Sequence, residues 1–485
     1  MGGLKLSNHK ANVSENNSKI VKAGAAYVIG NYLLKGITFL SAPIFTRLLS
    51  TSDYGEFSTY YSYEAIVYIL VGLALHSSIN NAKYKYGERL DEYVSSIIAL
   101  IMLSTGAWLI FANVGYGFYG EAFGFSRAVA NLLIIHCMCS SFMQVYNVYI
   151  SLNYSVGMFL KVSAFNGIFN IIVSVMLILT VFSDQRSLGR IVGTVVPIVL
   201  IGIYIVVFFF KKVAPSFNRE FWKFGLVYSI PIIPHGIAQV VLSIFDRIMI
   251  RDMVGAAANG IYSFAYTIHA LFNVVATSLD KVWKPWLYEK MEAKEYEEIR
   301  RQGTKYAFGM ALYTVMIVLA APEIIKVLGD KEYWGATPCV IPVVLGGYFT
   351  FLYTLPSLVE FFYGKTKLIA VGTMGAAVIN VVTNYIFIQA YGYIAAAYTT
   401  LITYILCFVF HYLMAKKVHG NVIYDTKKLL LISSVTLAIG LITIFLEKYW
   451  LIRWLLLIVV GLYTIYWGDK QFGVVKKVKA KMSRI

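Results

Sequence analysis

Residues 189–210 read GRIVGTVVPIVLIGIYIVVFFF, a run of 22 residues in which Arg190 is the only charge. A helix of about 20 apolar residues is long enough to cross a hydrocarbon core of about 30 Å. Similar stretches recur along the whole chain, so the sequence predicts an all-α integral membrane protein with about 14 transmembrane helices. The predicted spans are 22–47, 54–76, 94–116, 128–150, 160–182, 189–210, 224–250, 257–279, 304–328, 336–358, 367–389, 393–414, 428–446 and 450–467.

The composition supports the membrane class. Hydrophobic residues make up 59% of the 485 residues, charged residues only 14%, and the mean hydropathy is +0.68. A chain of this kind is too apolar for several soluble domains, and a membrane β-barrel would show alternation instead of long apolar runs. The first twenty residues are polar and lack the apolar core of a secretory signal, so no cleaved segment is expected.

The distribution of lysine and arginine predicts the orientation in the membrane. If the N-terminus is cytoplasmic, 31 of the 42 basic residues fall on the inner side and 10 on the outer side, with Lys35 left inside a span. Basic residues concentrate in cytoplasmic loops, so both termini are expected on the cytoplasmic side of the inner membrane. The same distribution explains the net charge of +17, and no nucleic-acid partner is expected.

Two sequence similarities within the chain indicate an internal repeat. Residues 54–61 (YGEFSTYY) resemble 259–266 (NGIYSFAY), and 189–194 (GRIVGT) resemble 392–397 (GYIAAA). Two six-helix lobes in parallel pseudo-repeat follow, because six helices bring the chain back to the same face. The predicted organisation is a cytoplasmic head at 1–21, an N-lobe at 22–210, a cytoplasmic linker at 211–223, a C-lobe at 224–414, two further helices at 428–467 and a basic cytoplasmic tail at 468–485.

Charges at membrane depth are the main functional evidence, because burying them is costly without a polar cavity or a partner. Lys35 and Glu64 lie near the middle of the first two spans. In the functional interpretation, Lys35 contacts an anionic substrate and Glu64 takes up a proton or cation. In the structural interpretation, the two residues form a buried ion pair that holds two helices together.

A second charged group, formed by Asp246, Arg247 and Arg251, lies at the outer end of the seventh span. Arg247 and Arg251 are four residues apart on one helical face and could clamp a phosphate. Alternatively, Arg251 reaches the outer headgroups. Asp246 is a second candidate for ion coupling.

Other charged segments and the cysteines receive structural interpretations. The inner loop from Asp280 to Lys305 is typical of an amphipathic surface helix. The four cysteines fall inside apolar spans and are expected to be buried. Acidic and basic residues close to span ends are expected to be interfacial, namely Glu323, Lys326 and Glu360.

Two prolines and several tyrosines complete the list of candidates. Pro231 and Pro234 are expected to break the seventh helix and to allow a hinge. Tyr61 and Tyr266 lie on the helices that carry charges, where aromatic rings could stack on sugars or simply pack. The sequence contains no metal-ligand spacing or nucleotide-binding loop, so no cofactor is expected.

Several motifs together resemble a known family. They are FGLVYSIPIIPH (224–235), FDRIMI (245–250), NGIYSFA (259–265), LLSTSDYGEF (48–57), GKTK (364–367), AVINVVTN (377–384) and YGYIAAA (391–397). As a set they are similar to Wzx-type polysaccharide repeat-unit flippases of the multidrug/oligosaccharidyl-lipid/polysaccharide exporter superfamily.

The resemblance implies twelve core helices around a cationic cavity and translocation of undecaprenyl-pyrophosphate-linked oligosaccharides to the periplasmic leaflet by alternating access, for O-antigen (lipopolysaccharide) or capsule synthesis. Lys35, Arg247 and Arg251 are then candidate substrate contacts, while Glu64 and Asp246 are candidates for coupling to an ion gradient. The implied partners are the lipid-linked oligosaccharide, membrane lipids and other polysaccharide-assembly proteins.

Two alternatives remain. A cation-coupled drug exporter of the same superfamily would favour acidic cavity residues. A polytopic polymerase or acyltransferase enzyme would carry a large catalytic loop, which the sequence lacks.

Overall fold

The computed structural model describes residues 36–37, 39–152 and 155–472, and this part of the chain contains helices and no strand. Eleven helices within it are long and apolar enough to cross a membrane. The predicted all-α, multi-pass fold is therefore confirmed. The chain divides into two compact units, which are described separately.

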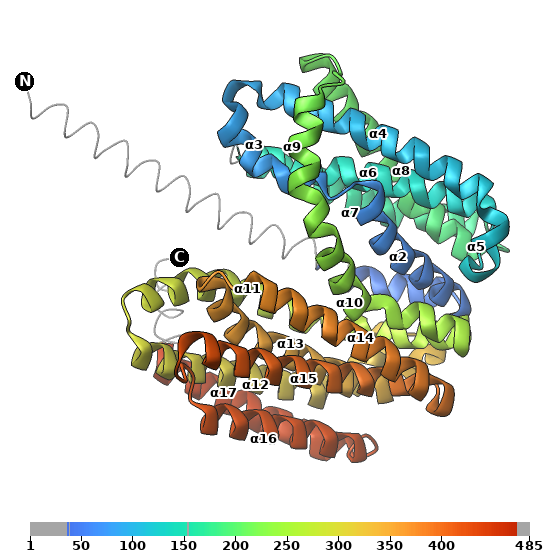
Figure 1. Cartoon of the computed structure of the whole chain (residues 1–485). Coiled ribbons are helices and arrows are strands. Elements are labelled where there is room, and N and C mark those ends of the chain that lie inside the picture. Colours follow the sequence, from blue (N-terminus) through green and yellow to red (C-terminus); the bar gives the residue numbers. More distant parts are fainter. Residues whose placement is uncertain (1–35, 38, 153–154, 473–485) are drawn as a thin grey trace, which may run out of the picture. The chain divides into compact units, whose positions relative to one another are not determined.

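Unit 1 consists of residues up to Leu49 and of Glu56–Ile244. Its helices are most of α2 (Thr51–Val71), α3 (Ile79–Tyr86), α4 (Leu90–Val114), α5 (Tyr116–Phe123), α6 (Arg127–Leu152), α7 (Val156–Leu179), α8 (Arg186–Lys212), α9 (Arg219–Ser229) and the first half of α10 (Ile233–Met253) (Figure 1). The apolar run that opens the sequence analysis forms α8, which packs against both α6 and α7. The hydrophobic core of unit 1 includes Phe142, Ile205 and Phe209, which are fully or almost fully buried.

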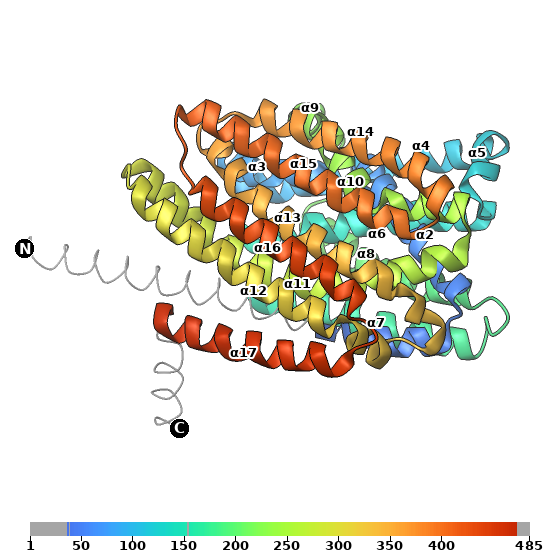
Figure 2. The same ribbon diagram turned by 90° about the horizontal axis from the view of Figure 1, so that it is seen from below.

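Unit 2 consists of Ser50–Gly55 and Phe245–Ile485. Its helices are the end of α10, α11 (Ala256–Glu292), α12 (Tyr296–Leu328), α13 (Thr337–Phe362), α14 (Thr366–Tyr391), α15 (Ile394–His419), α16 (Thr426–Phe445) and α17 (Trp450–Phe472). Helix α13 packs on α15 and on α12, and Figure 2 shows these helices running in a similar direction.

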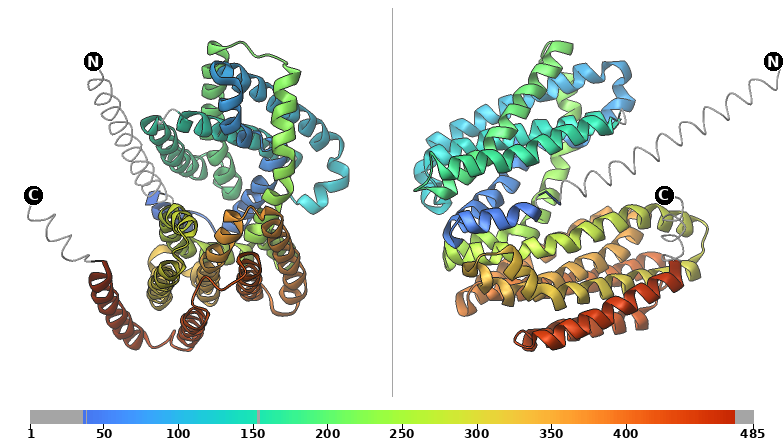
Figure 3. Two further views of the ribbon diagram at one scale, coloured as in Figure 1. Left: turned by 60° about the vertical axis from the view of Figure 1, so that its left-hand side comes forward. Right: turned by 180° about the vertical axis from the view of Figure 1, so that it is seen from behind.

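Helix α13 is the centre of unit 2 and α17 is its periphery. In the most apolar 18-residue window of each helix, 78% of the residues are buried in α13 but only 6% in α17. Figure 3 shows α16 and α17, in dark red, at the margin of this unit. Both helices pack on α12. They lie outside the predicted repeat, and an apolar helix with so little protein contact is suited to a lipid environment.

Two glycines at corresponding positions of the predicted repeat touch each other's helices inside unit 2. A Cβ added to Gly55 would lie 1.8 Å from the Ala256 carbonyl oxygen, and one added to Gly260 would lie 1.8 Å from the Thr51 carbonyl oxygen. The Asn259 amide also donates to the Gly55 carbonyl oxygen at 2.9 Å. Only glycine permits backbones to approach so closely. The first turn of α2 is thereby fixed against α11.

Three of the predicted spans are not among the eleven apolar helices. The span 22–47 falls largely outside the described residues, while 54–76 and 257–279 correspond to α2 and to most of α11. Both of these helices form, but they carry many polar residues. Thus the second helix of each predicted lobe is unusually polar for a membrane protein.

The prediction of one surface helix from Asp280 to Lys305 is wrong. Instead, α11 continues to Glu292 and α12 begins at Tyr296, with a turn at Lys294, whose φ is 59°. At about 1.5 Å per residue, the 37 residues of α11 extend over roughly 55 Å, well beyond a hydrocarbon core. Six of the 13 charged residues of this segment form short-range ion pairs, namely Lys290 with Glu295, Arg300 with Glu297 and Arg301 with Glu298.

The two-unit division crosses α10 between Ile244 and Phe245. The predicted lobe boundaries, with a linker at 211–223, stay a prediction.

Candidate functional site

A buried carboxylate in α10 is held by two tyrosines from α11. Asp246 is 2% exposed and accepts hydrogen bonds from the hydroxyls of Tyr262 and Tyr266, the latter at 3.3 Å. The two tyrosines are four residues apart on one face of α11, and their hydroxyl oxygens are 3.1 Å apart. The second carboxylate oxygen, Oδ1, is buried and has no hydrogen-bond partner among the described residues.

Arg247 belongs to the same cluster. Its guanidinium lies over the ring of Tyr266, 4.6 Å from the ring centroid, and its Nε is buried without a partner in the described part of the chain. His269 packs edge-on against Tyr266, with 5.6 Å between ring centroids. A buried polar atom without a partner is costly, by about 1–3 kcal/mol each. Asp246 Oδ1 and Arg247 Nε are therefore suited to an additional ligand or ion.

The structure brings together three predicted site residues, Asp246, Arg247 and Tyr266. It adds Tyr262, whose contact with Asp246 the sequence does not reveal. Arg251 has a different neighbour from Arg247, because its guanidinium pairs with Asp252 at 3.2 Å. The phosphate clamp formed by Arg247 and Arg251 stays a prediction.

Unit 1 contains a second polar cluster between α2 and α6. Tyr60, Glu64 and Tyr68 lie four residues apart, so they share one face of α2. The Tyr60 hydroxyl is 3.1 Å from Nδ1 of His136, and the Ser140 side chain faces the Glu64 carboxylate. Glu64 is 9% exposed and has no ion-pair partner among the described residues.

The predicted pairing of Lys35 with Glu64 is not tested, because Lys35 lies outside the described residues. Tyr61 is 49% exposed and has Phe57 as an aromatic neighbour at 6.4 Å between centroids. Its predicted contact with substrate stays a prediction.

The two candidate hinge prolines coincide with an irregular segment. A 3₁₀ turn at Ile230–Ile232 contains Pro231 and separates α9 from α10, and Pro234 follows in the first turn of α10. Proline removes a backbone donor and interrupts regular α-helix. Nδ1 of His235 is buried here without a partner among the described residues. The helix is broken at these residues, and their role as a hinge stays a prediction.

Sequence reasoning assigned no role to Arg190, although it is the only charge in the run 189–210. Its Nη1 donates to Asn170, Ser174 and Thr194 at 2.5, 2.7 and 3.1 Å. Its guanidinium also lies 3.8 Å from the centroid of the Phe45 ring. The only available signal was its place at the start of the repeated motif GRIVGT.

Two charged residues near the ends of predicted spans are buried, and one of them, Glu360, was predicted to be interfacial. Glu360 is 0% exposed, and its Oε1 is 3.0 Å from Nδ1 of His411, which is also fully buried. Arg453, close to the start of the last predicted span, is 1% exposed and binds Glu323 through two hydrogen bonds of 2.6 and 2.5 Å. Position near a span end did not predict exposure, because neighbouring helices cover both sites. The four cysteines are free and buried, as predicted.

Comparison with known proteins identifies the family. A family model described as "Polysaccharide biosynthesis protein" matches residues 20–291, more than half of the chain. The chain belongs to the polysaccharide biosynthesis protein family.

A relative agrees in length with this member of the polysaccharide biosynthesis family, and solved structures agree with it in fold. This chain is 24% identical over 452 residues to the uncharacterized membrane protein MJ1068 of Methanocaldococcus jannaschii. The alignment covers 85% of this chain and 87% of the relative. The fold is similar to that of the lipid II flippase MurJ in an inward closed conformation, with a TM-score of 0.71 and 17% identity over 93% of this chain and 99% of MurJ.

The fold is also similar to that of an inward-facing multidrug resistance MATE family transporter of the MOP superfamily. The TM-score is 0.65, with 14% identity over 80% of this chain and 96% of the transporter. The family model thus confirms the predicted link to polysaccharide biosynthesis, and the structural comparisons confirm the likeness of fold to transporters of the MOP superfamily.

Proposed function

We propose that this protein is a flippase that moves undecaprenyl-pyrophosphate-linked oligosaccharide repeat units from the cytoplasmic to the periplasmic leaflet by alternating access, driven by an ion gradient. Membership of the polysaccharide biosynthesis family is the observation that carries the proposal. The likeness of fold to a lipid II flippase supports it further. The protein then acts as a transporter, resides in the inner membrane and has both termini in the cytoplasm.

The polar clusters support transport of a charged glycolipid. A pyrophosphate and its sugars cannot cross hydrocarbon without a polar path, because desolvation of such groups is too costly. In this chain the polar helices α2 and α11 carry Glu64, Tyr262 and Tyr266, and α10 adds Asp246 and Arg247. We assign contact with the pyrophosphate or acidic sugars to Lys35, Arg247 and Arg251, contact with sugars to Tyr61 and Tyr266, and ion coupling to Glu64 and Asp246.

A cation-coupled drug exporter is the second candidate. The likeness of fold to a multidrug transporter and the two buried carboxylates favour it. The arginine beside Asp246 favours an anionic substrate instead, because a guanidinium binds phosphate oxygens in a forked geometry.

Deletion of the gene tests the proposal. We expect lipid-linked repeat units to accumulate on the cytoplasmic leaflet, as measured by extraction of labelled glycolipid and by its protection from a periplasmic probe. Expression of the wild-type chain should reverse the accumulation. If the deletion strain instead becomes sensitive to cationic drugs and its glycolipids are unchanged, the exporter alternative replaces the flippase.

The same strain tests the charge at position 35. We expect Lys35→Arg to restore surface glycan and Lys35→Ala to fail, because only the former keeps a cation for the pyrophosphate. Equal rescue by both variants, at equal protein levels on immunoblots, would remove the charge-based role of Lys35.

A further inference from the structure

Four apolar helices of unit 2 have a common end. Helix α13 stops at Phe362 and α14 begins at Thr366, while α15 stops at His419 and α16 begins at Thr426. The hydroxyl oxygen of Tyr363 is 2.7 Å from Nδ1 of His419, so the turn after α13 lies beside the end of α15. All four helices are long and apolar enough to cross a membrane. Their common end therefore lies at a membrane surface.

Exposed lysines gather at this end, whereas acidic side chains are scarce. Six lysines in the two turns and the adjoining helix ends are exposed to solvent, namely Lys365, Lys367, Lys416, Lys417, Lys427 and Lys428. The nearby acids are Glu360, which is fully buried against His411, and Asp425, which pairs with Lys428 at 3.1 Å. Within the described part of the chain, none of the other five lysines forms an ion pair. We call this surface the lysine-rich end.

The charged segment at the turn between α11 and α12 has a different composition. Residues 280–305 contain seven basic and six acidic side chains, and three of the basic ones pair with acids of the same segment. The preference of basic residues for the cytoplasmic side of a membrane applies to both surfaces. It does not explain why acids accompany the bases at one surface and are nearly absent from the other.

A small hollow opens beside the lysines. It is lined by Val359 of α13, by Tyr412 and Lys416 of α15, and by the loop Asn421–Tyr424. Among the described residues that line it, Lys416 is the only charged one, and most of the others are apolar or aromatic. A cation in an apolar hollow at a membrane surface suits a ligand that is anionic at one end and apolar at the other.

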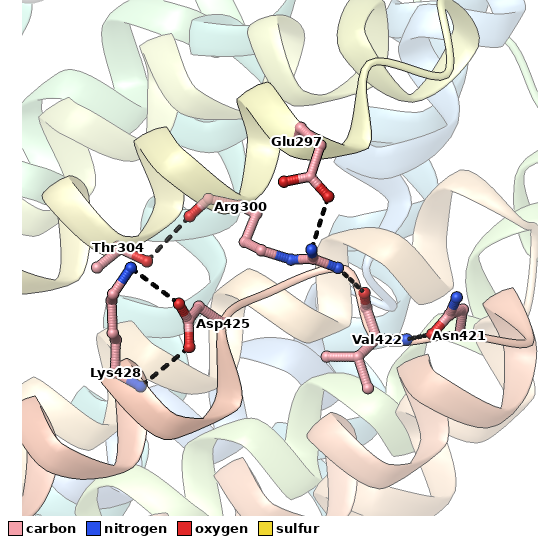
Figure 4. Close-up of polar contacts among 7 residues, drawn as sticks. All are labelled: Glu297, Arg300, Thr304, Asn421, Val422, Asp425 and Lys428. Carbon is pink, nitrogen blue, oxygen red and sulfur yellow. Dashed lines mark hydrogen bonds and ion pairs between the residues drawn. The ribbon is translucent and has the colours of Figure 1, made fainter.

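The loop that forms one wall of the hollow is held in place by its neighbours, as Figure 4 shows. Arg300 of α12 donates to the Val422 carbonyl oxygen at 3.0 Å and pairs with Glu297 at 2.6 Å. Oδ1 of Asn421 accepts from the backbone N–H of Val422 at 2.7 Å. Because this bond uses the oxygen of the carboxamide, Nδ2 of Asn421 is left to donate to a ligand.

We propose that the lysine-rich end binds the headgroup of an anionic phospholipid. Lys416 and Nδ2 of Asn421 donate to the phosphate oxygens in the hollow, and the apolar wall at Val359 accommodates the adjoining part of the lipid. The surrounding lysines attract anionic headgroups, as clusters of basic residues next to membrane helices do. This inference goes beyond the proposed function, because the ligand is a lipid of the surrounding membrane and not the transported glycolipid.

Two observations favour a phospholipid over a soluble anion or an acidic protein surface. The lining of the hollow is mostly apolar, and a soluble anion would gain nothing from such a wall. In addition, Tyr363 and Tyr412 lie at this end, and tyrosines are typical of the headgroup level of a bilayer. The predicted topology places the site in the cytoplasmic leaflet.

Thermal unfolding of the purified full-length protein in micelles of a neutral detergent tests the proposal. The probe is phosphatidylglycerol at increasing mole fraction, and phosphatidylcholine with the same acyl chains is the comparison without net charge. We expect phosphatidylglycerol to raise the unfolding midpoint, because a ligand of the folded state stabilises it, and phosphatidylcholine to leave the midpoint unchanged. Added salt should reduce the shift, since it screens exposed charges.

A double variant and a matched control locate the site. Lys416→Gln/Lys417→Gln should weaken the apparent affinity for phosphatidylglycerol by about 25-fold, since each lysine near an anionic surface contributes about fivefold. The control Lys290→Gln/Lys294→Gln removes the same charge from the turn between α11 and α12. It should keep the wild-type affinity, because acids surround those lysines.

A single variant tests the contact inside the hollow. Asn421→Asp keeps an oxygen for the backbone N–H of Val422 and replaces the amide donor with a negative charge. We expect an unchanged midpoint without lipid and a reduced shift with phosphatidylglycerol. If the double variant does not fold, this variant decides.

Three results would overturn the proposal. The first is an equal loss of affinity in the double variant and its control, which would mean that the lipid responds only to total charge. The second is the same shift with inorganic phosphate alone, which would assign the site to a soluble anion. The third is the absence of a shift with phosphatidylglycerol in the wild-type chain, which would leave an acidic protein surface as the occupant. None of these measurements depends on the flippase assignment, because no glycolipid is present.

Discussion

Unit 2 contains two arginine sites that differ in how fully their buried polar atoms are hydrogen-bonded. Arg453 has two carboxylate oxygens and three backbone carbonyl oxygens as acceptors. Arg247 lies over an aromatic ring beside Asp246, and both residues keep a buried atom without a partner among the described residues. A charge with complete hydrogen bonding stabilises the fold, whereas incomplete hydrogen bonding leaves capacity for a ligand. We therefore expect mutations at the first site to affect stability and mutations at the second to affect transport.

The largest effect on stability is expected from Arg453→Met. It leaves the Glu323 carboxylate, which is 26% exposed, without its partner. Breaking a fully buried pair costs about 3–5 kcal/mol, and the exposure of Glu323 to solvent lowers the cost expected here. The measurement is the free energy of unfolding in mixed micelles. The double variant Arg453→Met/Glu323→Leu should recover most of the loss, because it removes both charges; a double variant as unstable as the single one would contradict the proposed anchoring role.

A smaller effect is expected from Gly260→Ala, which disturbs the position of the helix that carries Tyr262 and Tyr266. The added methyl group would collide with the Thr51 carbonyl oxygen, and overpacking of this kind costs about 1–3 kcal/mol. Thermal unfolding of the purified protein measures the change. Gly375→Ala is the control, because a Cβ there meets no other atom within 4 Å. Equal midpoints for both variants would show that the backbone contact is dispensable.

Substitution of Asp425 is expected to have a smaller effect on stability, and one that depends on pH. Its carboxylate accepts from the backbone N–H of Lys428 and pairs with the Lys428 ammonium, and both interactions lower the pKa of Asp425. A lowered pKa means that the stabilisation is present above the ordinary Asp pKa of about 3.9 and is lost as pH falls through the folded-state value. Asp425→Ala should cost about 1 kcal/mol near neutral pH, the usual size of a helix N-cap, and the difference should vanish in acid. A difference that stays constant with pH in thermal unfolding would exclude this cap.

Asp246→Asn is expected to have the smallest effect on stability, below about 1 kcal/mol, because an amide oxygen still accepts hydrogen bonds from tyrosine hydroxyls. Transport should nevertheless be lost, since the negative charge next to Arg247 is gone. Surface glycan in the deletion strain measures transport, and unfolding of the purified variant measures stability. Full transport with normal stability would mean that the carboxylate of Asp246 has no part in the cycle.

The sequence predicted the helices well because membrane spans depend on length and apolarity, which are local properties. The run at 189–210 became α8, and the prolines at 231 and 234 mark a real interruption between α9 and α10. The second helix of each predicted lobe also forms, but α2 and α11 are more polar than the eleven helices that are apolar enough to cross a membrane.

The site was predicted only in part, because its contacts join distant segments. The four-residue spacing of Tyr262 and Tyr266 places them on one face of α11, but nothing in that spacing shows that they bind Asp246. Similarly, Glu360 lies near a helix end, where hydropathy suggests water, yet α15 buries it against His411. Depth along a helix can be estimated from sequence, whereas the neighbours at that depth depend on tertiary packing.

The bond between Arg453 and Glu323 also has an evolutionary consequence. Glu323 belongs to α12, whereas Arg453 belongs to the C-terminal hairpin of α16 and α17, so neither residue is favourable without the other. A homologous chain that lost this hairpin would retain an unneutralised acid in α12. We therefore expect gain or loss of the hairpin among homologues to coincide with the appearance or replacement of the acidic residue at position 323.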